Sequence, residues 1–259
     1  MLTAEAAIAT RPRIEVRDLD MVYGDRVVQR GLDFAVGAGD IFAIMGPSGV
    51  GKSTLLRHMI GLVAPARGDV YYDDASFWTA AESGRQRILR RVGVLYQDGA
   101  LWSSMTLAEN VALPVEEFTG LPPSTIRDVA RLKLALVGLA GFEDSYPPQI
   151  SGGMRKRAGL ARAMALDPDI LFFDEPSAGL DPISARLLDD LILELRDSLG
   201  ATVVVVTHEL ASIFAIATNS VFLDDEARTI TAAGNPTTLL HECRDAKVRR
   251  FLTRGGAKG

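Results

Sequence analysis

The sequence predicts an α/β fold with a mainly parallel sheet that helices cover on both faces. Short runs rich in β-branched and aromatic residues alternate with longer segments of helical periodicity, the order found in parallel sheets with crossover helices. Several of these runs are apolar at consecutive positions, as expected for strands buried on both faces. The expected strands span residues 14–16, 41–45, 92–96, 170–173, 202–207 and 221–223.

The helical segments fall into two groups within what we interpret as a single domain, residues 1–259. Residues 185–199 place leucines mostly on one face, as in a helix that packs on a sheet. Residues from about 99 to 165 combine several prolines with apolar residues at helical spacing, and we interpret them as a helical subdomain inserted into the core. The core then comprises residues of about 12–98 and 166–235.

A basic tail, residues 236–259, follows the core. We expect it to form a solvated surface helix with a frayed end, and whether it docks on a partner or on acidic lipid headgroups stays open. Its basic residues include Lys247, Arg249, Arg250, Arg254 and Lys258.

Composition narrows the classes of function. Apolar residues make up 47% of the chain and charged residues 24%, which is typical of a globular protein with a hydrophobic core. The formal net charge of −5 argues against a nucleic-acid partner, since nucleic-acid binders usually carry a basic excess. The single cysteine, Cys243, excludes an intrachain disulfide and fits a reducing compartment.

No stretch resembles a signal peptide or reaches the roughly 20 apolar residues of a membrane span. We therefore expect a soluble, cytosolic protein. If it serves a membrane, it does so by binding a protein already there.

A glycine-rich loop follows the expected strand 41–45 and precedes a helix-forming run. In the pattern Gly-x-x-x-x-Gly-Lys-Ser, the glycines let successive backbone N–H groups point at phosphates, and the helix N-terminus adds partial positive charge. Lys52 is expected to neutralise the β- and γ-phosphates, Ser53 to ligate Mg²⁺ and Thr54 to bond a phosphate oxygen. The loop predicts a nucleoside triphosphate site, a feature that kinases, GTPases and ATPases share. Its residues are Gly46, Pro47, Ser48, Gly49, Val50, Gly51, Lys52, Ser53 and Thr54.

Two carboxylates end the buried strand at residues 170–173. Asp174 is expected to hold Mg²⁺, directly or through water, because Mg²⁺ prefers oxygen ligands and keeps several waters. Glu175 points in a different direction and is expected to polarise the attacking water.

Further motifs, in the family's order along the chain, resemble those of ABC ATPases. Ser151-Gly152-Gly153 resembles the ABC signature and lies just upstream of the acidic strand. The run from Glu175 to Asp181 resembles the segment that leads from the catalytic glutamate into the D-loop. Three single residues also match the pattern: His208 as the switch histidine, Gln97 as the Q-loop glutamine and Tyr23 as the aromatic that stacks on adenine.

The resemblance implies a P-loop (RecA-like) core with an N-terminal antiparallel β region and an inserted helical subdomain. It implies ATP and Mg²⁺ as cofactors, catalytic roles for Glu175, His208, Lys52 and Gln97, and metal contacts from Ser53, Gln97 and Asp174. The signature residues Ser151, Gly152 and Gly153, together with Asp181, would contact a nucleotide held by a second subunit, so that two copies form a head-to-tail homodimer.

The subgroup is indicated by residues around two of these motifs. Met154 ends the signature where glutamine is common, and a basic continuation, residues 155–163, follows it. This pattern and residues 96–106 are similar to the Mla or toluene-tolerance group of MCE-associated phospholipid transporters. The segment between Gln97 and Ser151 is too short for the coiled coil of DNA-repair relatives, and a single phosphate loop excludes the twin-cassette translation factors.

The subgroup implies an ATPase that drives phospholipid transport across the cell envelope. Its partners would be a separate integral membrane permease, an MCE-domain lipid-binding protein and a small STAS-domain protein. Its place would be the cytoplasmic face of the inner membrane. The alternative is the ATPase of an importer or exporter of small polar solutes.

Overall fold

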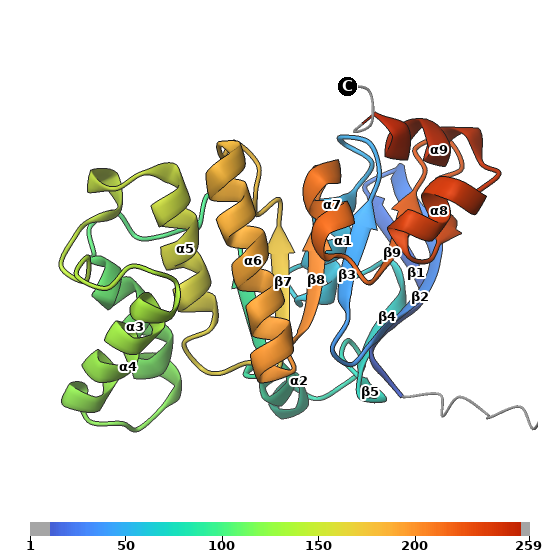
Figure 1. The fold of residues 1–259 in the computed structure, drawn as a ribbon. Coiled ribbons are helices and arrows are strands. Elements are labelled where there is room, and N and C mark those ends of the chain that lie inside the picture. The colour runs from blue at the N-terminus through green and yellow to red at the C-terminus, as the bar shows by residue number, and fades with distance from the viewer. Residues whose placement is uncertain (1–10, 255–259) are drawn as a thin grey trace, which may run out of the picture.

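The computed structural model describes residues 11–254, which form two sheets flanked by helices (Figure 1). The central sheet has the strand order β10-β9-β3-β8-β7-β6, and only β10 pairs antiparallel. The expected α/β fold with a mainly parallel sheet is confirmed. Its strands are β3 (Ile41–Met45), β6 (Val92–Leu95), β7 (Ile170–Asp174), β8 (Thr202–Val206), β9 (Asn219–Leu223) and β10 (Ile230–Ala233).

A second, antiparallel sheet with the order β2-β1-β4-β5 contains the N-terminal region, as the fold class implied. Only residues 14–16 of this sheet were predicted as a strand from the sequence. The other strands mix charged and apolar residues, because one face of this sheet is covered and the other is partly exposed. The strands are β1 (Pro12–Tyr23), β2 (Arg26–Gly37), β4 (Arg67–Tyr72) and β5 (Ala75–Ser76).

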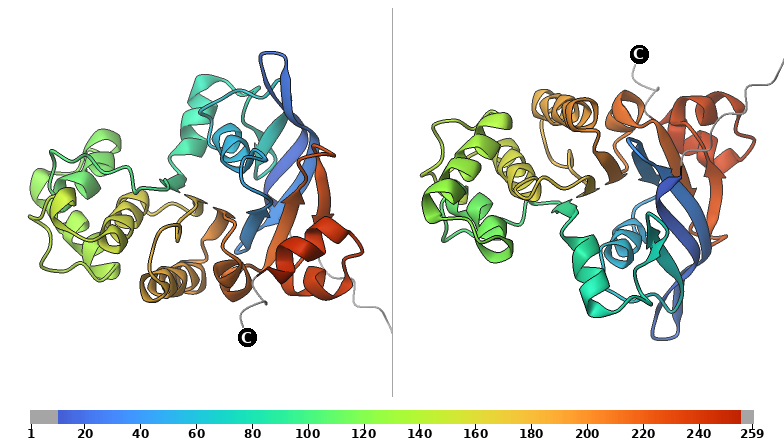
Figure 2. Two further views of the ribbon diagram at one scale, coloured as in Figure 1. Left: turned by 90° about the horizontal axis from the view of Figure 1, so that it is seen from above. Right: turned by 90° about the horizontal axis from the view of Figure 1, so that it is seen from below.

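Helices cover both faces of the central sheet (Figure 2). Every residue of β3, β7 and β8 is buried, and successive side chains face opposite ways. Phe42 and Phe172 pack in one hydrophobic cluster with α1, whereas Phe173 and Val203 pack in another with α6. The flanking helices are α1 (Lys52–Met59), α2 (Glu82–Leu89), α6 (Pro182–Leu199) and α7 (Leu210–Ile216).

A helical subdomain stands beside the sheets (Figure 1). One hydrophobic cluster runs from its helices into α6 and the central sheet, so the subdomain and the core share packing. The boundaries expected near residues 98 and 165 stay a prediction. The subdomain's helices are α3 (Leu107–Phe118), α4 (Pro123–Leu136), the short 3₁₀ helix η1 (Pro147–Gln149) and α5 (Gly152–Ala163).

The C-terminal tail differs from the solvated surface helix that the sequence predicted. It forms α8 (Pro236–Glu242) and α9 (Ala246–Thr253) rather than a solvated surface helix. Val248, Phe251 and Leu252 lie on one face of α9 and are buried, with the Phe251 ring 5.3 Å from that of Phe222. The expectation was wrong because the intervening arginines concealed this apolar stripe. Lys258 lies outside the described residues.

Between residues 11 and 254 no helix is long and apolar enough to cross a membrane.

Candidate active site

The phosphate loop connects the end of β3 to the start of α1. Gly46 has a φ of 146°, and a Cβ placed there would lie 2.7 Å from the Leu223 carbonyl oxygen. Gly51 has a φ of 109°, and a Cβ there would lie 2.7 Å from Val28. Glycine is therefore required at both positions by backbone conformation and by space. One hollow joins the loop to other predicted residues; it is lined by Ser48, Gly49, Gly51, Lys52, Ser53, Thr54, Gln97, Glu175 and His208.

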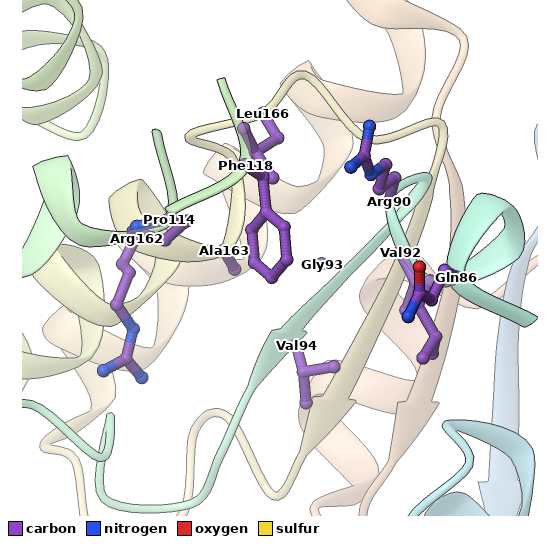
Figure 3. A pocket seen from close by; sticks show the side chains of 11 residues that line it. Gln86, Arg90, Val92, Gly93, Val94, Pro114, Phe118, Arg162, Ala163 and Leu166 are labelled. Carbon is purple, nitrogen blue, oxygen red and sulfur yellow. The ribbon is translucent and has the colours of Figure 1, made fainter. Parts of the chain in front are cut away.

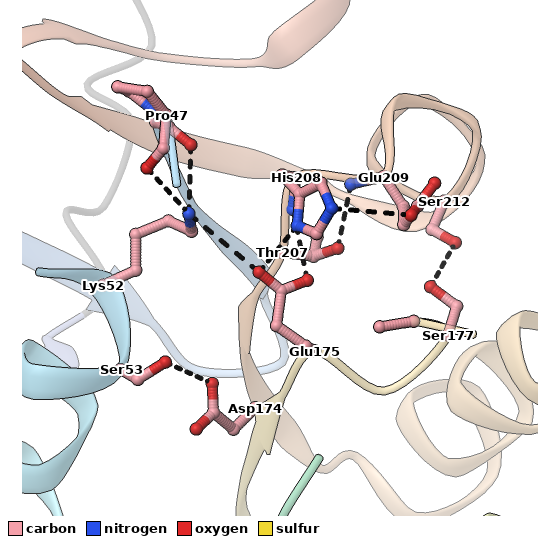
Figure 4. Close-up of polar contacts among 12 residues, drawn as sticks. Pro47, Lys52, Ser53, Asp174, Glu175, Ser177, Thr207, His208, Glu209 and Ser212 are labelled. Atoms are coloured by element: carbon pink, nitrogen blue, oxygen red, sulfur yellow. Dashed lines mark hydrogen bonds and ion pairs between the residues drawn. The ribbon is translucent and has the colours of Figure 1, made fainter. Parts of the chain in front are cut away.

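Lys52 reaches back over this loop. Its ammonium group donates to the carbonyl oxygens of Gly46 at 3.0 Å and Pro47 at 3.1 Å, and it lies 3.9 Å from Glu175 Oε1 (Figure 4). The side chain is only 6% exposed, and burial lowers the pKa of its amine. The positive charge is thus held at the place where the sequence predicts phosphates.

Asp174 and Ser53 meet at the end of β7. Ser53 Oγ donates to Asp174 Oδ1 at 2.7 Å, and burial raises the pKa of the Asp174 carboxyl against the opposing effect of this bond. A hydroxyl and a carboxylate oxygen at the edge of a phosphate-binding loop fit Mg²⁺. No cluster of three His, Cys, Asp or Glu side chains suited to a metal occurs in residues 11–254. Gln97 lines the same hollow and is the further protein ligand that the sequence predicts.

Glu175 adopts an unusual backbone conformation. Its φ is 49°, in the left-handed region that side chains other than glycine rarely occupy, and its N–H donates to the Val206 carbonyl at 2.8 Å. This turn separates its carboxylate from that of Asp174. Glu175 Oε1 lies 2.8 Å from His208 Nδ1, and the His208 backbone N–H also faces the carboxylate at 3.4 Å (Figure 4).

Tyr23 does not line the hollow with the phosphate loop. It ends β1 at the hairpin with β2, and its side chain is 45% exposed. The same two strands contact the loop through Met21 and Val28, which face Gly51. An adenine ring between Tyr23 and the loop stays a prediction.

The signature residues also lie outside the hollow. Ser151 is the N-cap of α5 and accepts a hydrogen bond from the Met154 N–H at 3.2 Å. A Cβ at Gly153 would lie 3.1 Å from Ser184 Oγ on α6, so the signature packs against the helix that Asp181 begins. Asp181 caps that helix by accepting from the N–H groups of Ile183 and Ser184.

Two further buried polar residues, which had no predicted role, hold the backbone around the site through hydrogen bonds to carbonyl oxygens. Lys156, on α5, donates to the carbonyl oxygens of Glu175 at 3.3 Å and Ala178 at 2.5 Å, and burial lowers the pKa of its amine. Gln29, on β2, donates to the carbonyl oxygens of Val50 and Asp224, each at 3.0 Å. Lys156 was visible only as part of a basic run. Gln29 gave no signal, because its contacts depend on tertiary packing.

Comparison with known proteins agrees with this geometry. The ABC transporter family matches residues 29–178 of the chain, which include the phosphate loop, the signature and the acidic strand. The chain belongs to the ABC transporter family. As an ABC ATPase it binds and hydrolyses ATP.

Individual relatives cover three quarters or more of this ABC ATPase. The intermembrane phospholipid transport system ATP-binding protein MlaF of Haemophilus influenzae is 40% identical over 239 residues, 92% of this chain and 89% of the relative. The probable ribonucleotide transport ATP-binding protein mkl of Mycobacterium tuberculosis is 44% identical over 197 residues, 76% of this chain and 55% of the relative. A solved dimer of the ATP-binding cassette MJ0796, bound to ADP and Pi, superposes with a TM-score of 0.77 at 28% identity, covering 85% of this chain and 97% of that one.

A groove separates the edge strand β6 of the ABC core from the helical subdomain (Figure 3). Apolar side chains from both parts line it: Leu89, Val92, Val94, Pro114, Phe118 and Leu166. Arg162, also on its wall, donates to the carbonyl oxygens of Gly99 and Ala100, just after Gln97. The groove is therefore connected to the loop that carries Gln97.

Proposed function

We propose that this ABC ATPase powers phospholipid transport across a cell envelope through a separate permease. The observation that carries the proposal is the 40% identity to MlaF over 92% of the chain. The signature, which ends in Met154 and continues into a basic helix, supports the same subgroup. The second candidate is transport of a small polar solute, which the similarity to the mycobacterial ribonucleotide protein favours.

Nucleotide binding is assigned to the phosphate loop. Its N–H groups and Lys52 surround the phosphates, while Tyr23 stacks on the adenine. Ser53, Asp174 and Gln97 hold Mg²⁺, which when bound neutralises phosphate charge and fixes the orientation of the terminal phosphates. Burial of Lys52 and Asp174 increases the strength of these charged contacts, since less water screens them.

Hydrolysis is assigned to Glu175 and His208. Glu175 accepts a proton from the attacking water, and its left-handed backbone aims the carboxylate toward the hollow rather than at the metal ligands. His208, 2.8 Å from that carboxylate, orients it and contacts the γ-phosphate. Lys156 holds the backbone of Glu175 through the carbonyl oxygen and so preserves this arrangement.

The second half of each site comes from another copy of the chain. Ser151, Gly152 and Gly153 open α5, whose N-terminal N–H groups suit an anion, yet they do not line the hollow around Lys52. A head-to-tail homodimer places them, with Asp181, against the nucleotide of its partner, and the dimeric state of the MJ0796 cassette supports this arrangement.

The groove between β6 and the helical subdomain is the proposed contact with the permease. A helix seated there would reach Arg162, which holds the carbonyl oxygens of Gly99 and Ala100 beyond Gln97, and this connection links transport to the nucleotide site. The chain would then lie at the cytoplasmic face of the inner membrane, with an MCE-domain protein and a STAS-domain protein in the same complex.

The test uses the chain co-expressed and co-purified with a candidate permease and reconstituted in phospholipid vesicles. We expect ATP-dependent transfer of fluorescent phospholipid to or from acceptor vesicles, and loss of transfer with Glu175→Gln. Glu194→Gln, an exposed acid on α6, is the matched control and should transfer at the normal rate. Ribonucleotide uptake into these vesicles without lipid transfer would support the second candidate and overturn the first.

A further inference from the structure

A buried polar cluster lies between α6, α7 and the segment after Glu175. Asp189 on α6, Ser212 on α7 and Ser177 are each about 5% exposed or less. Ser212 Oγ lies 2.9 Å from Asp189 Oδ2 and 3.3 Å from Ser177 Oγ. Figure 4 shows the hydroxyls of Ser177 and Ser212 facing each other. The three side chains therefore connect three segments of the chain through one hydroxyl group.

Each member of the cluster belongs to a segment that carries a site residue. Ser177 comes two residues after Glu175. Ser212 lies on the helix that follows His208, and Asp189 lies on the helix that Asp181 caps. No member lines the hollow around the phosphate loop. The cluster is thus placed to hold the catalytic segments relative to each other without touching the nucleotide.

Burial of the Asp189 carboxyl carries a free-energy penalty at this position. Among the described residues no group donates a hydrogen bond to its Oδ1. Arg186 and Asp190 on α6 are the charged groups that act on it, and Glu209 at the start of α7 lines the same hollow. Burial raises the pKa of its carboxyl to about 6. An apolar residue would pack here without this penalty. The hydrogen bond with Ser212 offsets part of this penalty and ties Asp189 to the cluster.

We propose that Asp189 is a positioning residue for ATP hydrolysis, which holds the segments of Glu175 and His208 in register through Ser177 and Ser212. Lys156 binds the carbonyl oxygens of Glu175 and Ala178, and Ser177 is a further point at which this segment is held. The inference rests on the roles proposed for Glu175 and His208.

The charge of Asp189 sets the direction of the hydrogen bonds. Ser212 has one hydroxyl hydrogen. When the carboxylate is ionised, Ser212 donates to it and accepts from Ser177. When the carboxyl is protonated, it donates to Ser212, which then donates to Ser177. A change of pH through 6 therefore reverses the hydrogen bond between Ser212 and Ser177. Asparagine at position 189 has an amide oxygen that only accepts, so Ser212 still donates to it and accepts from Ser177.

Steady-state hydrolysis by the full chain in complex with its permease tests the proposal. Asp189→Ala should lower kcat about tenfold and leave the KM for ATP within twofold, because the phosphate loop is untouched. Asp189→Asn should restore kcat to within twofold at pH 7.5. Between pH 7.5 and 5.5, the wild-type kcat divided by that of Asp189→Asn should fall at least twofold. The control Glu194→Gln, an exposed acid further along α6, should leave kcat and its pH profile unchanged.

Three results would overturn the proposal: a normal kcat in folded Asp189→Ala, a change confined to KM, or an asparagine variant as slow as the alanine variant. If Asp189→Ala does not fold, as judged by its Tm, Ser212→Ala decides in its place and should also lose kcat. Glu175→Gln is measured beside them. Its normal turnover would refute the assigned base, whereas its failure to turn over beside an unaffected Asp189→Ala would refute only the positioning role.

Discussion

The phosphate-loop side and the signature side of this ABC ATPase are built in different ways. Around the loop, Lys52, Asp174 and Glu175 are buried. Asp174 accepts a hydrogen bond from Ser53, next to Lys52, and the Lys52 ammonium lies 3.9 Å from the Glu175 carboxylate. At the signature, Ser151 is exposed, and its side chain accepts only the cap bond from Met154 among the hydrogen bonds of the described residues. One side is a preorganised catalytic half-site, and the other presents a helix N-terminus outward. This difference is what the proposed completion of each site by a second copy requires.

Glu175→Gln separates binding from chemistry on the phosphate-loop side, and we expect the largest effect here. Turnover should fall by roughly 10² to 10⁴, the usual contribution of a general base. ATP binding should persist, because Lys52 and the loop are unchanged, and the ATP-bound dimer should accumulate. Phosphate release assays and gel filtration with ATP measure both effects. Turnover near the wild-type rate would remove Glu175 from its assigned role.

Lys52→Ala tests whether the buried ammonium group contributes to the affinity for ATP. Removal of a charged partner from phosphate should weaken ATP binding by roughly 10- to 100-fold, the equivalent of about 1.5–3 kcal/mol. Isothermal titration calorimetry with ATP and Mg²⁺ measures the Kd. Ser151→Ala is the comparison variant, and in a dilute monomer it should bind ATP normally. Equal losses in the two variants would contradict the division into two halves.

Asp189→Asn tests the energetic effect of burying the Asp189 carboxyl, through the free energy of unfolding. Because burial raises the pKa of Asp189 to about 6, the native state binds this proton more tightly than the unfolded chain. Wild-type stability should therefore decrease as pH rises from about 4 to 6, and stay lower above pH 6.

The asparagine variant should be more stable than the wild type above pH 6 by about 1–2 kcal/mol, part of the roughly 3 kcal/mol that two pKa units represent. The advantage should shrink toward pH 4. Urea denaturation across this range measures it, with the exposed Glu194→Gln as control. A constant difference at all pH values would mean that Asp189 does not titrate in this range.

Much of the architecture could be predicted from the sequence because its signals are local. Ile41–Met45 and the four valines that end Thr202–Val206 are continuous apolar runs, and the glycines of the phosphate loop mark a backbone that other residues rarely adopt. The strands β2 and β4 were missed because polar and apolar residues mix in a partly exposed sheet. The apolar stripe of α9 was missed because arginines interrupt it along the sequence, and its contact with Phe222 shows that it is buried.

The site was predicted in the same uneven way. Motifs indicated the residues that contact nucleotide, but they could not indicate the residues that hold these in place. Lys156, Gln29 and Asp189 act through backbone carbonyls or hydroxyls far away in the sequence. Such contacts arise from tertiary packing and leave no pattern along the chain. The left-handed backbone of Glu175 is likewise visible only in the structure.

The most direct test of the two-half site is a mixture of two inactive variants, Lys52→Ala and Ser151→Arg. In a head-to-tail dimer of one of each, both defects fall in one site and the other site is intact. Equal amounts, allowed to exchange subunits, should therefore recover about a quarter of wild-type hydrolysis if the sites act independently. Each variant alone should stay inactive. If the mixture is as inactive as its parts, although heterodimers are shown to form, Ser151 does not complete the site of a second copy.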